Sequence, residues 1–153
     1  MKLIYLALLI PLFTSNPAYS QTGNRTKNFN LENGLAVKGY DVVAYFTQNK
    51  AVKGNANFST TVEGVTYHFS NAANRDQFQK DYKKFEPQYG GWCAYAMGSS
   101  GEKVEIDPET FKIESGKLYL FYHTWINNTL TKWNKDETKL RLSADKNWQT
   151  IFH

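Results

Sequence analysis

Two stretches of the chain alternate apolar and polar residues, and each alternation predicts a β-hairpin. The first runs over residues 58–71 around a Glu63-Gly64 turn, and the second over residues 110–123 around Ser115-Gly116. A period of two is that of a half-buried strand, and a glycine-containing pair between two such strands indicates a tight turn. The return strand of the first hairpin places Val65, Tyr67 and Phe69 on an apolar face and Thr66, His68 and Ser70 on the opposite face.

Other stretches carry apolar residues at helical spacing. Asp41 is placed to cap a short helical turn over residues 42–46, and Ser70 or Asn71 to cap a helix that runs to about Phe85. Two further helices close the chain, with apolar faces formed by Ile126, Leu130 and Trp133 and by Leu140, Ala144, Trp148 and Ile151. The predicted fold is a single small α+β domain, in which two β-hairpins form a small antiparallel sheet packed by three to four helices.

The first twenty residues have the pattern of a cleavable secretory signal. Lys2 precedes an apolar run over residues 3–13, and Ala18-Tyr19-Ser20 places small residues at the two positions that signal peptidase reads. We therefore predict a signal peptide over residues 1–20 and export to the periplasm or the medium. No later apolar run is long enough to cross a membrane after cleavage.

Residues 21–34 are polar and rich in asparagine, which predicts a flexible leader anchored by Phe29, and residues 35–153 then form the folded domain. Without Lys2, the chain has 17 basic and 14 acidic side chains, a net charge of +3. Lys83-Lys84 is the one adjacent basic pair after the signal, so the sequence lacks the basic patch of a nucleic-acid-binding protein. The oligomeric state stays open.

Cys93 is the only cysteine in the sequence, so no internal disulfide can form. Cys93 and Met97 are four residues apart and would share a face in a helix or in a strand. Two sulfur ligands with an imidazole suit copper or another transition metal, and His68 and His123 are the candidate imidazoles. Gly90-Gly91 allows a helix to begin near Cys93, where the helix dipole would favour a thiolate. The alternative is that Cys93 and Met97 are buried apolar fillers.

Several motifs resemble those of the longer, exported YHS-domain proteins. They are 39-GYDVVAYF-46, 64-GVTYHFSNAANRDQFQKD-81, 86-EPQYGGWCAYAM-97 and 107-DPETFKIESGKLYLFYH-123, and together with the intervening chain they cover about residues 35–150. The signature tyrosine, histidine and serine are Tyr67, His68 and Ser70, with Phe69 inserted. The resemblance implies binding residues at Asp41, Tyr67, His68 and Cys93.

The sequence departs from the shorter YHS domains, which are thought to bind metal through cysteines. Ala44 stands where the first such cysteine would be, and residues 70–74 at the predicted helix start contain none. The metal site of the short domains therefore does not carry over. His123 stands where the family more often has asparagine or serine, so we treat it as particular to this chain.

Three functions are consistent with these features. The preferred one is an exported binding module for a transition metal or a small ligand, centred on His68 and Cys93. The second is a structural or protein-interaction domain in which both residues belong to the core. The third is a thiol enzyme in which His68 activates Cys93, and it lacks a resolving cysteine and a clear oxyanion hole. The sequence therefore favours a binding protein over an enzyme.

Overall fold

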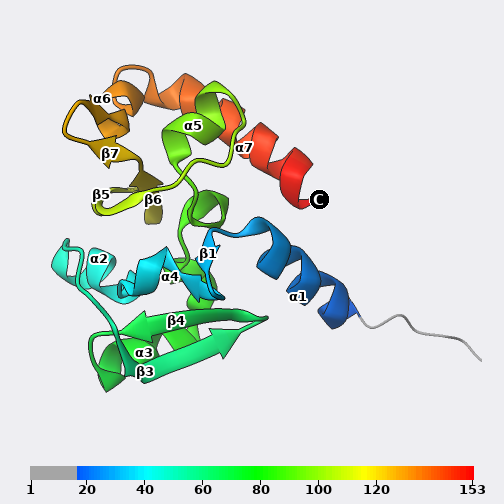
Figure 1. Ribbon diagram of the computed structural model, residues 1–153, viewed down its shortest axis with the longest axis vertical. Helices are drawn as coiled ribbons and strands as arrows, with labels where there is room; N and C mark the ends of the chain where they lie inside the picture. The colour runs from blue at the N-terminus through cyan, green and yellow to red at the C-terminus, as the bar shows by residue number, and fades with distance from the viewer. Residues whose placement is uncertain (1–16) are drawn as a thin grey trace, which may run out of the picture.

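The computed structural model describes residues 17–153, with side chains from residue 22 onward (Figure 1). The described α-helices are α1 (Pro17–Asn28), α2 (Val42–Gln48), α3 (Ala72–Lys80), α4 (Tyr82–Phe85), α5 (Ala94–Ser99), α6 (Thr129–Trp133) and α7 (Glu137–Phe152). The strands are β1 (Leu31–Glu32), β2 (Leu35–Ala36), β3 (Asn55–Val62), β4 (Val65–Phe69), β5 (Asp107–Glu114), β6 (Lys117–Phe121), β7 (His123–Thr124) and β8 (Asn127–Asn128). Two 3₁₀ turns, η1 (Val37–Gly39) and η2 (Gln88–Gly91), complete the order, and the α+β class is confirmed.

Both predicted hairpins are present. Glu63 and Gly64 between β3 and β4, and Ser115 and Gly116 between β5 and β6, all have positive φ, as tight two-residue hairpin turns require. The hairpins lie in separate sheets rather than in one. The first joins a four-stranded sheet of order β1-β2-β4-β3, in which β2 and β4 run parallel, and β5-β6 and β7-β8 are separate pairs.

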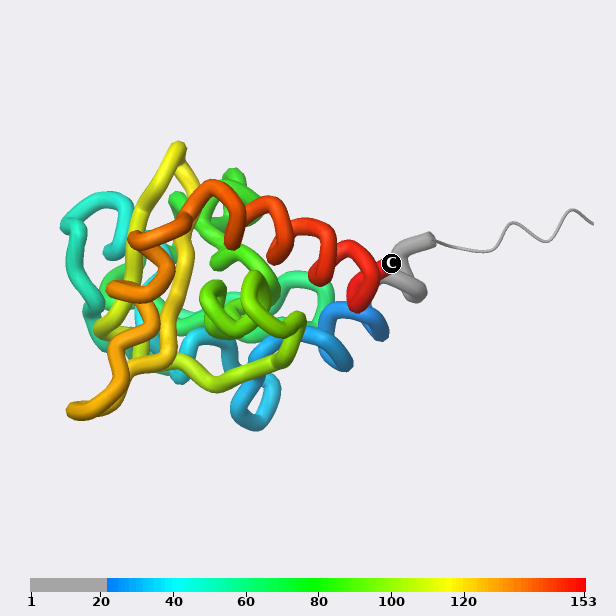
Figure 2. Tube along the Cα trace, turned by 90° about the horizontal axis from the view of Figure 1, so that it is seen from above, coloured from blue at the N-terminus to red at the C-terminus, as the bar shows by residue number. Residues whose placement is uncertain are grey.

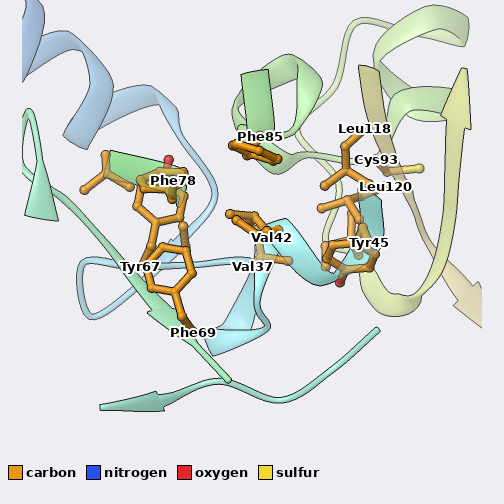
Figure 3. Close-up of a cluster of buried hydrophobic side chains, with 14 of the residues drawn as sticks. Val37, Val42, Tyr45, Tyr67, Phe69, Phe78, Phe85, Cys93, Leu118 and Leu120 are labelled. Atoms are coloured by element: carbon orange, nitrogen blue, oxygen red, sulfur yellow. The ribbon is translucent and has the colours of Figure 1, made fainter. Parts of the chain in front are cut away.

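Strand β6 separates two apolar clusters. Leu118 and Leu120 pack in the first cluster with β4, α2 and α3, whereas Tyr119 and Phe121 pack in the second with α5, α6 and α7. Figure 3 shows part of the first cluster, with Val42 between the side chains of β4 and those of β6. Because each face of β6 meets its own cluster, this strand is apolar at almost every position.

Two predicted helices differ in detail from those in the structure. The helix after the first hairpin is capped by Asn71, as predicted, but it ends at Lys80, and Asp81 breaks it from α4 with φ −155° and ψ 70°. Helix α6 begins at Thr129, after the β7-β8 hairpin. Ile126 is therefore not on its apolar face but 73% exposed beside Trp125, which is 94% exposed.

The segment predicted to be a flexible leader is folded. Residues 21–28 belong to α1, whose last turn lies beside α7 in both views (Figures 1 and 2). Trp92 Nε1 donates to the carbonyl of Asn28 over 2.7 Å, and Asn30 N donates to the carbonyl of Gly90 over 2.9 Å. Sequence polarity misled the prediction, because α1 is held by polar contacts rather than by an apolar stripe.

The predicted signal peptide lies largely outside the described residues, since 1–16 are not described and 17–20 begin α1. Among the helices of residues 17–153, none is long and apolar enough to cross a membrane.

Candidate functional site

Cys93 lies inside the protein and its sulfur is already bonded. The residue is fully buried in the first cluster, immediately before α5. Its Sγ accepts from Tyr122 N over 3.3 Å and lies 3.4 Å from Thr129 Oγ1, which itself donates to the carbonyl of Tyr122. The thiol therefore ties the start of α5 to the chain between β6 and β7 and to α6.

Met97 does not join Cys93. Met97 is also fully buried, but it packs in the second cluster. The shared-face prediction failed because Cys93 is the N-cap of α5, with φ −58° and ψ 116°, so its side chain does not follow the helical rotation.

His68 lies on the opposite face of β4 from the buried Tyr67 and Phe69, as the alternation predicted. It is half-buried beside an open cavity that is lined by Glu32, Asn33, Leu35, Thr66 and His68 and contains no sulfur. In Figure 3, Cys93 lies on the far side of Val42 from Tyr67 and Phe69, the neighbours of His68. The structure therefore does not bring His68 and Cys93 into one site.

Asp41 and Tyr67 are buried and bonded to their own chain. Asp41 is fully buried and caps α2, as predicted, by accepting from Val43 N over 2.9 Å and Ala44 N over 3.3 Å. Its other oxygen accepts from Ser70 N, Ser70 Oγ and Asn74 Nδ2 over 2.8, 2.6 and 2.7 Å. Tyr67 is buried and donates to Glu86 Oε1 over 2.5 Å, and burial followed by the charge of Glu86 raises its pKa well above the usual value.

His123 lies at the start of β7, on the surface. Its Nδ1 is 3.1 Å from Thr110 Oγ1 and 3.3 Å from Asp107 Oδ2, and its side chain is 39% exposed. Within residues 17–153, no three or more His, Cys, Asp and Glu side chains gather in a group that could hold a metal ion. The four proposed metal ligands thus occupy separate environments.

A cleft that the sequence did not indicate lies between α1 and the C-terminal half of α7. We call it the α1–α7 cleft, and it has two lobes. The first lobe, of about 440 Å³, is lined by Arg25, Phe29, Lys83, Glu86, Pro87, Gln88, Tyr89, Gly90, Asp145, Trp148, Gln149, Phe152 and His153. The second, of about 400 Å³, is lined by Asn24, Arg25, Glu63, Tyr82, Lys83, Phe152 and His153.

The first lobe combines aromatic rings with hydrogen-bonding side chains. The Trp148 and Phe152 rings stack with centroids 5.3 Å apart, and Phe29 lies within 6.1 Å of both. Gly90 makes this packing possible, because a Cβ there would come within 2.8 Å of both Phe29 and Trp148. Tyr89 donates to Asp145 Oδ1 over 2.9 Å, and burial together with this bond raises the pKa of Tyr89.

Arg25 lies at the border of the two lobes and is 7% exposed. Its two terminal nitrogens donate to the two carboxylate oxygens of Glu86, and its Nε lies 3.1 Å from Glu63 Oε2. Burial lowers the pKa of Arg25, but the hydrogen bonds and charge of Glu86 more than reverse that effect. The guanidinium is also 4.5 Å from the centre of the Phe29 ring, and its Nε, although close to Glu63, makes no hydrogen bond within the described residues.

No family model, curated protein or solved structure matches the chain. Two sequence signals came nearest to the α1–α7 cleft. They were Phe29, predicted to anchor the N-terminal segment, and Trp148, predicted on the apolar face of the last helix. Neither indicated that residues so far apart in the sequence would meet.

Proposed function

We propose that this protein is an exported binding module whose small ligand occupies the α1–α7 cleft. The observation that carries this proposal is the first lobe, a cavity of about 440 Å³ that is lined by aromatic rings and by several hydrogen-bonding side chains. Small-molecule sites typically have this size and combine an apolar or aromatic lining with a few polar groups.

The charges of the first lobe favour a ligand with little or no net charge. Arg25 and Lys83 are balanced by Glu86 and Asp145. Because the Arg25 guanidinium is already paired with Glu86 and Glu63, it has little capacity left for an anion such as a phosphate. A neutral or zwitterionic molecule would keep these pairs intact.

This proposal keeps the binding module predicted from the sequence but moves its site away from His68 and Cys93. Cys93 is buried and bonded to its own chain, and a buried thiol of this kind is inert toward substrates and metals unless the fold opens. The cleft, by contrast, has exposed side chains at its rim, among them Lys83, Asp145 and Gln149.

A fragment screen by NMR tests the proposal. Small neutral fragments at about 1 mM should shift the indole signal of Trp148, which lines the cleft, and leave that of the buried Trp133 unchanged. Gln149→Ala, an exposed rim change, should weaken binding, and Trp125→Ala, an exposed change elsewhere, should not. A screen in which no fragment perturbs the cleft would overturn the proposal.

Copper(I) titration provides the opposing test. A tight one-to-one complex that shifts the signals of His68 and Cys93 would return the function to metal binding and count against the cleft. The expected result is no such complex in the folded protein.

A further inference from the structure

The lining of the α1–α7 cleft is unusual in composition. Among the lining residues whose side chains the structure describes, from residue 22 onward, none in either lobe is Leu, Ile, Val, Met or Ala, and Pro87 provides the one saturated hydrocarbon ring. The remaining side chains are aromatic rings or groups with planar polar ends, apart from Lys83 and Gly90. The planar polar set consists of Asn24, Arg25, Glu63, Glu86, Gln88, Asp145 and Gln149.

We propose that the ligand of this cleft is a neutral oligosaccharide of at least two sugar rings. This inference rests on the proposed function and specifies the class of its ligand. A pyranose has a face of C–H groups that packs on an aromatic ring, and an edge of hydroxyls that each donate and accept hydrogen bonds. Several of the planar groups are already bonded to their own chain, as Glu86 is to Arg25 and Tyr67. The Gln88 and Gln149 amides make no side-chain hydrogen bond within the described residues, so each offers a donor and an acceptor in one plane to neighbouring hydroxyls. Within the part of the chain whose side chains are described, no open-chain aliphatic side chain of the kind that suits lipids and apolar peptides lines this cleft.

The two lobes account for the length of the ligand. They share Arg25, Lys83, Phe152 and His153, so the two cavities lie next to each other, and we assign one sugar ring to each. Each lobe alone has a volume in the range of a complete small-molecule site. One ring would pack on the aromatic side chains of the first lobe. The next ring would lie in the second lobe near Tyr82, Glu63 and Asn24.

The charge balance agrees with a neutral ligand. Arg25, which borders both lobes, is held by Glu86 and Glu63, and Lys83 remains exposed at the shared rim. Lys83, which makes no ion pair among the described residues, is the one cation that an acidic sugar could pair with, and it lies exposed at the rim, where such a pair adds little. Oligosaccharides built from neutral hexoses or N-acetylhexosamines therefore fit better than uronic acids.

Titration with matched sugars tests the proposal. The probes are glucose, mannose, galactose and N-acetylglucosamine, together with their α- and β-linked disaccharides, each followed by the Trp148 indole and cleft amide signals. We expect at least one disaccharide to bind about tenfold more tightly than its monosaccharide, because the second ring adds contacts in the second lobe. Its signals should include Asn24 as well as Trp148.

Variants separate the two lobes. Trp148→Ala, and Gln149→Ala if the first variant folds poorly, should weaken monosaccharide and disaccharide binding alike. Tyr82→Ala should remove the advantage of the disaccharide and leave monosaccharide binding in place, because Tyr82 lines the second lobe alone. Trp125→Ala is the matched aromatic control, since it removes an exposed tryptophan outside the cleft.

The outcomes distinguish this inference from the function on which it rests. If neutral fragments shift the cleft signals but no sugar does at about 10 mM, a concentration that fills a millimolar site, the oligosaccharide assignment is wrong and the binding site stands. Equal affinity for a disaccharide and its monosaccharide would overturn the two-ring length. If neither fragments nor sugars perturb the cleft, both proposals fail.

Discussion

Two buried charged groups in this protein differ in what surrounds them. Asp41 is fully buried, and its two oxygens receive five hydrogen bonds from α2, from Ser70 at the end of β4 and from α3. Arg25 is almost as buried, but its partners Glu86 and Glu63 leave it at the border of two cavities. Asp41 therefore bonds core elements to one another, whereas Arg25 lines a cleft.

The difference shows why burial of a charge does not by itself mark a functional site. A carboxylate whose bonding is completed by its own chain has nothing left to offer a ligand. Asp41 is such a group, although its position in a family-like motif made it a candidate binding residue. The Arg25–Glu86 pair, in contrast, holds α1 against α4 and so creates a cavity wall from a segment that the sequence predicts to be a flexible leader.

The largest expected effect is from Asp41→Ala. This change removes a cap and leaves several buried donors without an acceptor, so we expect the free energy of unfolding to fall by about 4 kcal/mol. Chemical denaturation measures it. Asp81→Ala is the control, because Asp81 precedes α4 without a side-chain capping bond and should cost well under 1 kcal/mol. Similar losses in the two variants would show that the five hydrogen bonds of Asp41 do not stabilise the core as proposed.

Arg25→Met should be nearly as costly, at about 3 kcal/mol, because it leaves the Glu86 carboxylate buried without its partner. Unlike Asp41→Ala, it should also weaken ligand binding in the α1–α7 cleft. The double variant Arg25→Met with Glu86→Gln should recover part of the stability. Lys27→Met changes an exposed cation on the same helix and should alter neither property. Unchanged binding in Arg25→Met would show that Arg25, like Asp41, contributes to stability alone and not to the cleft.

Cys93 offers a third buried group for the same comparison. Cys93→Ala removes the acceptor of Tyr122 N and a buried sulfur, so we expect a loss of about 2 kcal/mol with no effect on the cleft. Cys93→Ser keeps an acceptor and should cost less. The wild-type thiol should react with an alkylating agent only after denaturation. Rapid alkylation of the folded protein would show that the thiol is accessible.

The smallest effect near neutral pH concerns Tyr67, which donates to Glu86 and has a raised pKa. The folded protein holds the phenol proton more tightly than the unfolded chain, so this stabilisation is complete below about pH 10 and is lost as the pH rises further. Tyr67→Phe should reduce the slope of stability against pH above about pH 10 by about 1 kcal/mol per pH unit. Thermal unfolding across this range measures the slope, and an unchanged slope would contradict the assignment.

The elements that the sequence predicted correctly depend on neighbours in the chain. The Asp41 cap, the Glu63-Gly64 and Ser115-Gly116 turns and the burial pattern of β4 each follow from residues within one or two turns of each other. Such features can be predicted from the apolar–polar periodicity and from the residue preferences of caps and turns. The resemblance to YHS-domain proteins stays a prediction.

The α1–α7 cleft could not be predicted from the sequence, because it depends on contacts between distant segments. Arg25 meets Glu86, and Phe29 meets Trp148, across separations that no local pattern encodes. The shared face of Cys93 and Met97 was wrong for a local reason, because a rule for residues inside a helix does not hold at its N-cap.

The docking of α1 has a practical consequence for producing the protein. Trimming the chain at residue 34, where sequence polarity alone would place the domain boundary, would retain both apolar clusters except Phe29 and Leu31 at the edge of the first. Such a shortened protein would lack Asn24, Arg25 and Phe29, and with them one side of each lobe. If the shortened protein failed to bind a ligand, the cause would be the missing wall of the cleft, and the result would say nothing about binding by the full chain.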